Sequence, residues 1–328
     1  MAGGVKALAL MSGGLDSILA VRVLAEQGVP VTAVHCTTPF SPTARAQAAE
    51  LARAAGVPLL ESPFADELIA AVLRPHHPRG RNLNPCIDCK IGMFRKAGEI
   101  MKADGYGFLV TGEVLGQRPL SQHREALMLI EREAGLERLV LRPLSAGLLP
   151  PTIPEERGWV DRSRLLSVEG RTRKAQFALA EKYGIKDPPT PAGGCLLTDP
   201  GYSRRLSDVI GNGNVIDGHL AEVLRHGRLY RMEGAARLVV GRNQADNEAL
   251  EALMVGGERL LKPVSRPGPT ALALAGFPDN ALPAAASVVA RYTDHEGDRP
   301  VEVEVGGGEA PSVVLSAEPA IPAGAVLV

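Results

Sequence analysis

Six residues near the N-terminus, Ser12-Gly13-Gly14-Leu15-Asp16-Ser17, constrain the fold more than any other part of this sequence. They follow an apolar run that predicts a buried strand, and they precede apolar residues at helical spacing. A strand, a glycine-rich turn and a helix start can form an anion-binding site, because the N–H groups of the turn and the positive end of the helix dipole are directed at the same ligand. Gly13 and Gly14 allow close approach of a phosphate, and Ser12 and Ser17 can donate hydroxyl hydrogen bonds to it. Asp16 indicates a Mg²⁺ ion between carboxylate and phosphate. The plainer alternative is an ordinary turn in which Ser and Asp only cap a helix.

The first half of the chain alternates short apolar runs with helical patterns, which predicts an α/β fold with a parallel sheet covered by helices on both faces. Strands are expected over 5–11, 31–35, 57–60 and 108–111, and helices over 16–27, 43–55, 65–73 and 92–103. Ligands of such folds lie at the carboxyl ends of the strands. The turn Thr111-Gly112-Glu113 should therefore share one crevice with the glycine-rich turn.

The sequence divides into three expected segments. Residues 1–200 form the nucleotide-binding domain, 201–227 a connector, and 228–328 a small α+β domain. Further elements are predicted within them: helix over 161–183, a Pro/Gly-rich loop over 186–194, and strands over 270–275, 286–292 and 300–305.

Composition narrows the class of protein. The chain has 328 residues, a net charge of −1, and 45% hydrophobic residues. No apolar run is long enough to span a bilayer, and no secretion signal is recognisable. Four cysteines in so long a chain are not a disulfide scaffold. We therefore expect a cytoplasmic protein without a membrane partner, whose cysteines serve as ligands, nucleophiles or core residues.

Three of the four cysteines form a candidate metal or sulfur site. Cys86 and Cys89 make a CxxC motif before a helical pattern, and Cys195 follows a Gly-Gly pair. The three thiolates could hold a [4Fe–4S] cluster with one iron open to an exogenous ligand. The alternatives are a zinc site or three unrelated thiols. Cys36, at the end of a strand, is interpreted as a core residue rather than a catalytic one.

Several motifs together resemble known families. Ser12–Ser17 resembles the pyrophosphate loop of the PP-loop ATP pyrophosphatase superfamily. The stretch Thr111–Gln117 with Ser121-Gln122 is similar to the TGExxGQxxSQ stretch of the tRNA 4-thiouridine synthetases, and Leu141–Leu144 resembles their RPL element. Asn84–Lys90 is similar to a stretch of the tRNA 2-thiouridylases. Residues 239–250 resemble the NFACT RNA-binding module.

The resemblance implies an ATP-dependent tRNA sulfurtransferase. It would adenylate a uridine carbonyl oxygen, release pyrophosphate, and replace that oxygen by sulfur to give 4-thiouridine or 2-thiouridine. ATP and Mg²⁺ would be required. The sulfur would come from hydrosulfide on the open iron of a [4Fe–4S] cluster, or through a persulfide on Cys195 fed by a donor such as a cysteine desulfurase. The alternatives are a PP-loop ligase or thiolase acting on a small molecule, and a non-catalytic RNA-binding protein. The oligomeric state stays open, a homodimer included.

The resemblance also assigns the site residues. Catalytic roles fall to Asp16, Cys86, Cys89 and Cys195, with Mg²⁺ on Asp16. ATP would contact Ser12, Gly13, Gly14, Asp16, Ser17, Gly112, Glu113 and Gln117. Local basic stretches would contact tRNA through Arg79, Arg81, Lys90, Arg171, Arg173 and Lys174. Each basic stretch has a plainer alternative as a solvated charged surface.

Overall fold

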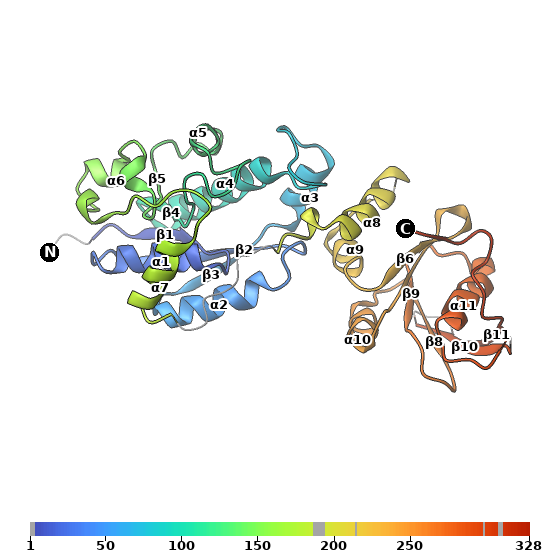
Figure 1. The fold of residues 1–328 in the computed structure, drawn as a ribbon. Coiled ribbons are helices and arrows are strands. Elements are labelled where there is room, and N and C mark those ends of the chain that lie inside the picture. The colour runs from blue at the N-terminus through green and yellow to red at the C-terminus, as the bar shows by residue number, and fades with distance from the viewer. Residues whose placement is uncertain (1–3, 186–193, 214, 298, 308–310) are drawn as a thin grey trace. The chain divides into compact units, whose positions relative to one another are not determined.

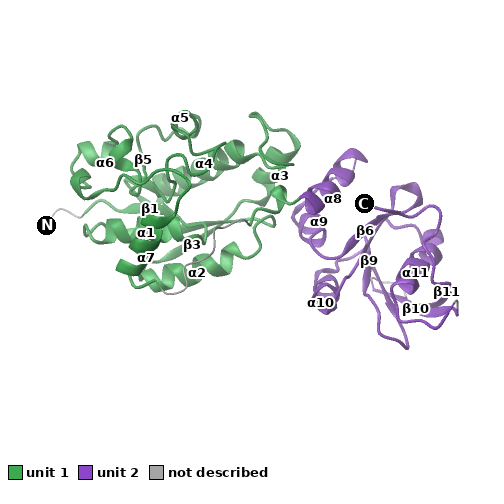
Figure 2. Cartoon of the chain, viewed as in Figure 1, with its two compact units in different colours: residues 1–199 green, residues 200–328 purple. Residues whose placement is uncertain are grey.

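A computed structural model describes residues 4–185, 194–213, 215–297, 299–307 and 311–328. The chain divides into two compact units, residues 1–199 and 200–328 (Figure 2). Apart from Gly194, the loop expected over 186–194 lies outside the described residues.

The first unit contains a parallel five-stranded sheet in the order β3-β2-β1-β4-β5 (Figure 1). The strands are β1 (Ala7–Leu10), β2 (Val31–Thr37), β3 (Leu59–Pro63), β4 (Phe108–Thr111) and β5 (Val140–Leu141). Successive strands extend from β1 to one edge, and β4 then lies on the other side of β1. The order reverses between β1 and β4, and ligands of α/β sheets bind at such a switch point, outside the carboxyl ends of the strands.

Alternating residues of β1 face two separate helical layers, as a strand's two-residue period requires. Ala7 and Ala9 pack into a core with α1 and α2, while Leu8 packs into a second core with α4 and α5. The expected doubly covered α/β fold is confirmed. The helices of this unit are α1 (Leu15–Ala25), α2 (Ala44–Ala55), α3 (Ala65–Leu73), α4 (Cys86–Asp104), α5 (Arg124–Glu133), α6 (Ile153–Glu156) and α7 (Lys174–Lys182).

The second unit is an α+β domain, as expected, built on a seven-stranded sheet in the order β11-β10-β8-β9-β7-β6-β12. The neighbouring strands pair antiparallel. Helix α11 (Leu282–Arg291) packs its buried face on β8, β10 and β11. The other elements are α8 (Pro200–Gly211), α9 (Gly218–Val223), β6 (Arg228–Arg231), β7 (Arg237–Val240), α10 (Gln244–Leu253), β8 (Arg259–Pro263), β9 (Ala271–Ala273), β10 (Val301–Gly306), β11 (Val313–Ala317) and β12 (Val326–Leu327).

Three predicted segments differ from the structure. The strand expected over 286–292 is wrong, because these residues belong to α11, where Pro283 fits the first turn and Leu282, Ala285 and Val289 bury one helical face. The helix expected over 161–183 is confined to α7 and a short 3₁₀ turn at 162–164. The connector expected over 201–227 instead contains α8 and α9 and belongs to the second unit.

Candidate functional site

The glycine-rich turn links β1 to α1 and begins the site. Gly13 adopts a positive φ of 78°, and a side chain there would also meet the Ala44 carbonyl oxygen at 2.9 Å. Ser17 Oγ donates to the Gly14 carbonyl at 2.7 Å, which closes the turn at the start of α1. Asp16 lies in the first helical turn, where the helix dipole favours a negative charge. Ser12 is exposed.

The turn after β4 packs directly on this helix start. A Cβ on Gly112 would lie 2.4 Å from the backbone carbonyl of Asp16 and 2.4 Å from the Ser17 nitrogen. The structure therefore brings the two turns together, as expected from the carboxyl ends of adjacent strands. Only a glycine permits this contact without displacing backbone.

Gln117 connects the same two turns through its side chain. Its Nε2 donates to Asp16 Oδ2 at 2.7 Å, and its Oε1 accepts from Gln176 Nε2 at 3.1 Å. Asp16 Oδ1 is buried and has no hydrogen-bond partner among the described residues. A buried carboxylate oxygen without a donor is suited to a cation, so the site fits a Mg²⁺ ion on Asp16.

Glu113 is held inside a charge network. Lys90 Nζ pairs with its Oε1, and Arg142 Nε donates to its Oε2 at 2.9 Å. Arg142 also pairs with Glu131. Burial opposes the charged carboxyl, but Lys90 and Arg142 outweigh it and lower the pKa of Glu113 to about 2. Both carboxylate oxygens are occupied, so the surroundings of Glu113 favour a structural role over the expected ATP contact.

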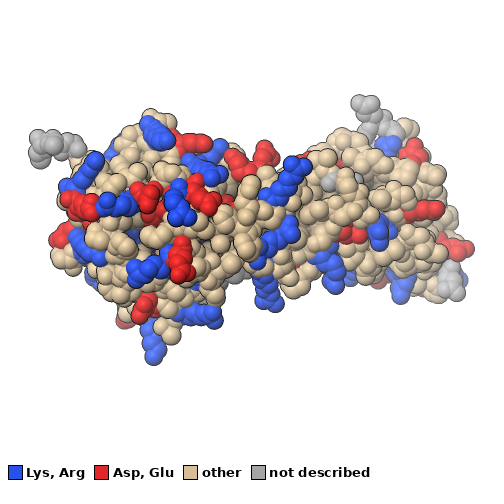
Figure 3. Space-filling view, turned by 90° about the horizontal axis from the view of Figure 1, so that it is seen from above, with Lys and Arg blue, Asp and Glu red and all other residues tan. Residues whose placement is uncertain are grey.

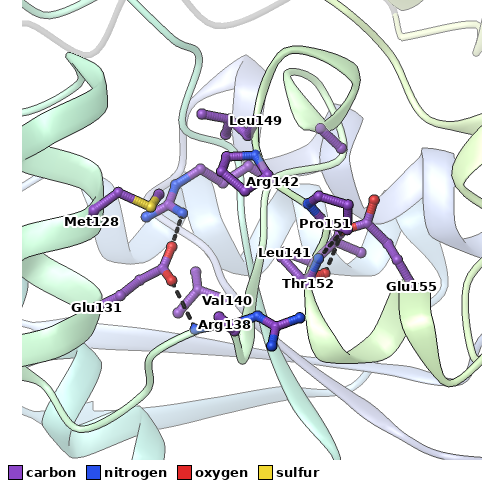
Figure 4. A pocket seen from close by; sticks show the side chains of 12 residues that line it. Met128, Glu131, Arg138, Val140, Leu141, Arg142, Leu149, Pro151, Thr152 and Glu155 are labelled. Carbon is purple, nitrogen blue, oxygen red and sulfur yellow. Dashed lines mark hydrogen bonds and ion pairs between the residues drawn. The ribbon is translucent and has the colours of Figure 1, made fainter.

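A small cavity lies beside this network, between α5 and α6 (Figure 4). Its volume is about 30 Å³, enough for a single water molecule. Figure 4 shows Glu131 reaching both Arg142 and the backbone nitrogen of Arg138 at its wall. Because Thr152 and Glu155 also pair with each other there, the cavity offers no free charged group to a ligand.

The cysteines gather at the same carboxyl edge of the sheet. Cys86 and Cys89 lie in the first turn of α4, which begins six residues before the helix predicted at 92. Cys86 Sγ donates to Ser121 Oγ at 3.6 Å. The turn that follows Cys195 is fixed by two backbone bonds, Leu196 N to Phe40 O at 2.9 Å and Leu83 N to Leu197 O at 3.2 Å.

Burial and the proximity of other thiols raise the pKa values of the cysteine side chains. Burial raises the pKa of Cys89, and the nearby thiols of Cys195 and Cys86 raise it further. Burial also raises the pKa of Cys195. Cys36 is buried at the end of β2, and burial raises its pKa to about 12, which keeps this thiol neutral. No three His, Cys, Asp or Glu side chains within the described ranges stand close enough to hold one metal ion.

The basic residues expected to contact RNA have different surroundings. Arg81, Arg171 and Lys174 are exposed. Arg79 is exposed too, but its Nη2 donates to the Val72 carbonyl at 2.7 Å. Lys90 is not available to RNA, because its ammonium group is buried against Glu113.

Arg173 differs from these. Its guanidinium group lies 5.3 Å from the Phe177 ring centre, and its Nε and Nη1 are buried without a partner among the described residues. Buried donors of this kind are suited to a bound anion more than to RNA on the surface.

Two residues of this arrangement, Gln176 and Arg142, were not predicted from the sequence as site residues. Gln176 lies in α7, far along the chain from both turns, and an isolated Gln in a helical pattern carries no signal. Arg142 belongs to the RPL element, which marked the position but not its pairing with Glu113. No described helix is long and apolar enough to cross a membrane.

The parallel sheet, with its glycine-rich turn at the β1/β4 switch point, gives the first unit the α/β fold expected of PP-loop proteins. Residues 3–147 match the family model described as "Thiamine biosynthesis protein (ThiI)", and residues 227–323 match that of the "NFACT protein RNA binding domain". Residues 3–147 are thus similar to the ThiI family, and residues 227–323 to NFACT RNA-binding domains. The resemblances to the thiouridine synthetases and to the NFACT module are confirmed.

Individual relatives agree with these matches. The chain is 36% identical over 119 residues to a "Probable tRNA sulfurtransferase" of Methanosarcina mazei, covering 34% of this chain and 29% of that protein. It is 34% identical over 100 residues to the "tRNA-specific 2-thiouridylase MnmA" of Cutibacterium acnes, covering 26% and 27%. The chain therefore spans less than a third of these relatives. A solved NAD+ synthetase from Burkholderia pseudomallei is 14% identical, with a TM-score of 0.32 and coverage of 68% and 81%.

Proposed function

We propose that this protein is an ATP-dependent tRNA sulfurtransferase that replaces a uridine carbonyl oxygen with sulfur. The observation that carries the proposal is the convergence of three features at one edge of the sheet: the glycine-rich turn, the turn at Gly112 and the thiols of Cys86, Cys89 and Cys195. Nucleotide and sulfur chemistry require such neighbouring sites, because the activated oxygen and the incoming sulfur act on one carbon atom.

The first half-reaction falls to the glycine-rich turn. The turn N–H groups with Ser12 and Ser17 would bind the pyrophosphate part of ATP, and Asp16 would hold Mg²⁺ through Oδ1. When bound, Mg²⁺ neutralises phosphate charge as the uridine oxygen attacks the α-phosphorus and pyrophosphate leaves. The buried Nε and Nη1 of Arg173 would donate to phosphate oxygens.

The second half-reaction falls to the thiols. Cys86, Cys89 and Cys195 would hold a [4Fe–4S] cluster, which would supply activated sulfur. Addition of sulfur to the activated carbon would expel the adenylated oxygen as AMP. A zinc site, with Cys195 as a persulfide carrier, is the second candidate. The NFACT-type domain and exposed residues such as Arg81 would bind tRNA phosphates.

The test measures each half-reaction separately. Anaerobically purified protein should absorb broadly near ~400 nm and contain about four irons per chain. With tRNA it should convert ATP to AMP and pyrophosphate, and mass spectrometry of digested tRNA should detect thiouridine. Asp16→Asn should abolish both steps, whereas Cys195→Ala should keep pyrophosphate release and lose thiouridine. Cys36→Ala is the matched control and should keep both.

Each alternative has its own outcome. ATP turnover that tRNA does not stimulate would contradict the tRNA substrate and favour a ligase or thiolase of small molecules. RNA binding without ATP turnover would leave a non-catalytic binding protein. Zinc in place of iron, with thiouridine still formed, would assign the CxxC pair to a structural site and Cys195 to persulfide transfer.

A further inference from the structure

Gln176 is completely buried in α7 and reaches across to the glycine-rich turn through Gln117. Helix α7 packs alongside α1, the helix that carries Asp16 (Figure 1). The buried amide of Gln176, the half-buried amide of Gln117 and the Asp16 carboxylate thus form a continuous chain of hydrogen bonds, at 3.1 Å and 2.7 Å.

The carboxylate dictates the orientation of both amides. An ionised Asp16 can only accept hydrogen bonds, so Gln117 must turn its NH₂ group toward it. The carbonyl oxygen of Gln117 then faces Gln176, which must present its own NH₂ group. A glutamine amide turned by 180° would place an oxygen against the Asp16 carboxylate. By donating to the Oε1 of Gln117, Gln176 helps to hold that amide in the rotation that Asp16 requires.

The chain of bonds occupies only one side of Asp16. Oδ2 accepts from Gln117, while Oδ1 is buried with no partner in the described part of the chain. The Oε1 of Gln176 is also buried without a described partner. Because most buried oxygens in proteins accept a hydrogen bond, these two oxygens are suited to a partner that the described residues do not supply.

We propose that Gln176 is a positioning residue, which holds Gln117 in the rotation that orients Asp16, so that Asp16 Oδ1 is directed at the magnesium ion of bound MgATP. This inference rests on the proposed role of Asp16 in holding Mg²⁺. Partners that orient a metal ligand in this way typically change metal affinity by about 10- to 100-fold when they are removed.

The test compares ATP affinity by isothermal titration calorimetry in Mg²⁺ and in EDTA, with the full-length chain. Gln176→Met keeps the volume of the side chain and removes its amide. The ratio of the ATP affinity in Mg²⁺ to that in EDTA should fall by about 10-fold or more in this variant. The affinity in EDTA should stay unchanged. Gln176→Glu should do the same, because its carboxylate would draw the Gln117 NH₂ group away from Asp16.

Two further variants separate the possible outcomes. Lys182→Ala removes the ion pair between α7 and Glu26, which follows α1, and leaves both amides intact. In this variant Mg²⁺ should increase the ATP affinity as much as in the wild type. Gln117→Met breaks the same chain of bonds and carries the test if Gln176→Met does not fold. This inference alone is overturned if Mg²⁺ increases the ATP affinity of the folded Gln176 or Gln117 variants as much as that of the wild type, while Asp16→Asn loses the increase. An unchanged gain in Asp16→Asn would overturn the proposed magnesium site itself.

Discussion

At the scale of single residues, Gly112 occupies a position in the site that has no room for a side chain. A Cβ there would press on the backbone of Asp16 and Ser17 at 2.4 Å, and backbone at a helix start cannot move aside as a flexible side chain could. We predict that Gly112→Ala separates the two turns and destabilises the first unit by about 1–3 kcal/mol. It should also weaken ATP binding, which calorimetry measures.

The control for this prediction is Gly211→Ala. Gly211 ends helix α8, and a Cβ there would meet no atom within 4 Å. Alanine also favours helix more than glycine, so this variant should unfold at or slightly above the wild-type denaturant concentration. Gly112→Ala with wild-type stability and ATP affinity would show that the β4 turn does not position Asp16.

At the scale of elements, Glu113 ties α4 to the end of β5. Its carboxylate lies between Lys90 of α4 and Arg142 just after β5; Glu113 and Arg142 are buried, and the Lys90 side chain is only 12% exposed. Glu113→Gln would leave Lys90 without its counter-charge and Arg142 with Glu131 alone, so we predict a loss of about 3–5 kcal/mol in the free energy of unfolding at pH 7. Denaturant titration measures this loss.

The pH dependence follows from the lowered pKa of Glu113. This carboxyl has a pKa of about 2 in the folded protein, against an ordinary value of 4.5. Its stabilisation is therefore complete above pH 4.5 and is lost as the pH falls toward 2. The difference between wild type and Glu113→Gln should be constant from pH 7 to pH 5 and shrink below pH 4.5. The control Glu67→Gln, in an exposed pair with Lys96, should cost about 0–1 kcal/mol.

The sequence could predict what depends on local pattern. The strand, the glycine-rich turn and the helix around Asp16 are contiguous, so hydrophobic periodicity and turn residues were sufficient to predict this segment. The strand predicted over 286–292 was wrong, because the burial of one face of α11 outweighs the strand preference of Val288 and Val289. Gln176 and Arg142 could not be placed, because their partners lie 59 and 29 residues away. Lys90 looked like a surface cation until the structure placed it against Glu113.

At the scale of the whole molecule, the two units have separate hydrophobic cores. One cluster of buried residues, from Tyr230 to Ala317, belongs to the second unit, and the cores around β1 belong to the first. On the face in Figure 3, acidic and basic side chains alternate over the first unit, in keeping with the net charge of −1. Separate cores predict that each unit unfolds cooperatively by itself.

The division of labour between the units gives the last prediction. If the second unit supplies most of the phosphate contacts to tRNA, a chain of residues 1–199 should bind MgATP with wild-type affinity. Its tRNA affinity should fall by about 10-fold or more, and the dependence of that affinity on salt should become shallower, because fewer counterions are released. Calorimetry and filter binding at several salt concentrations measure the two affinities. Unchanged tRNA affinity would instead assign RNA recognition to exposed cations of the first unit such as Arg81, and an Arg81→Ala variant of the short chain would then have to lose it.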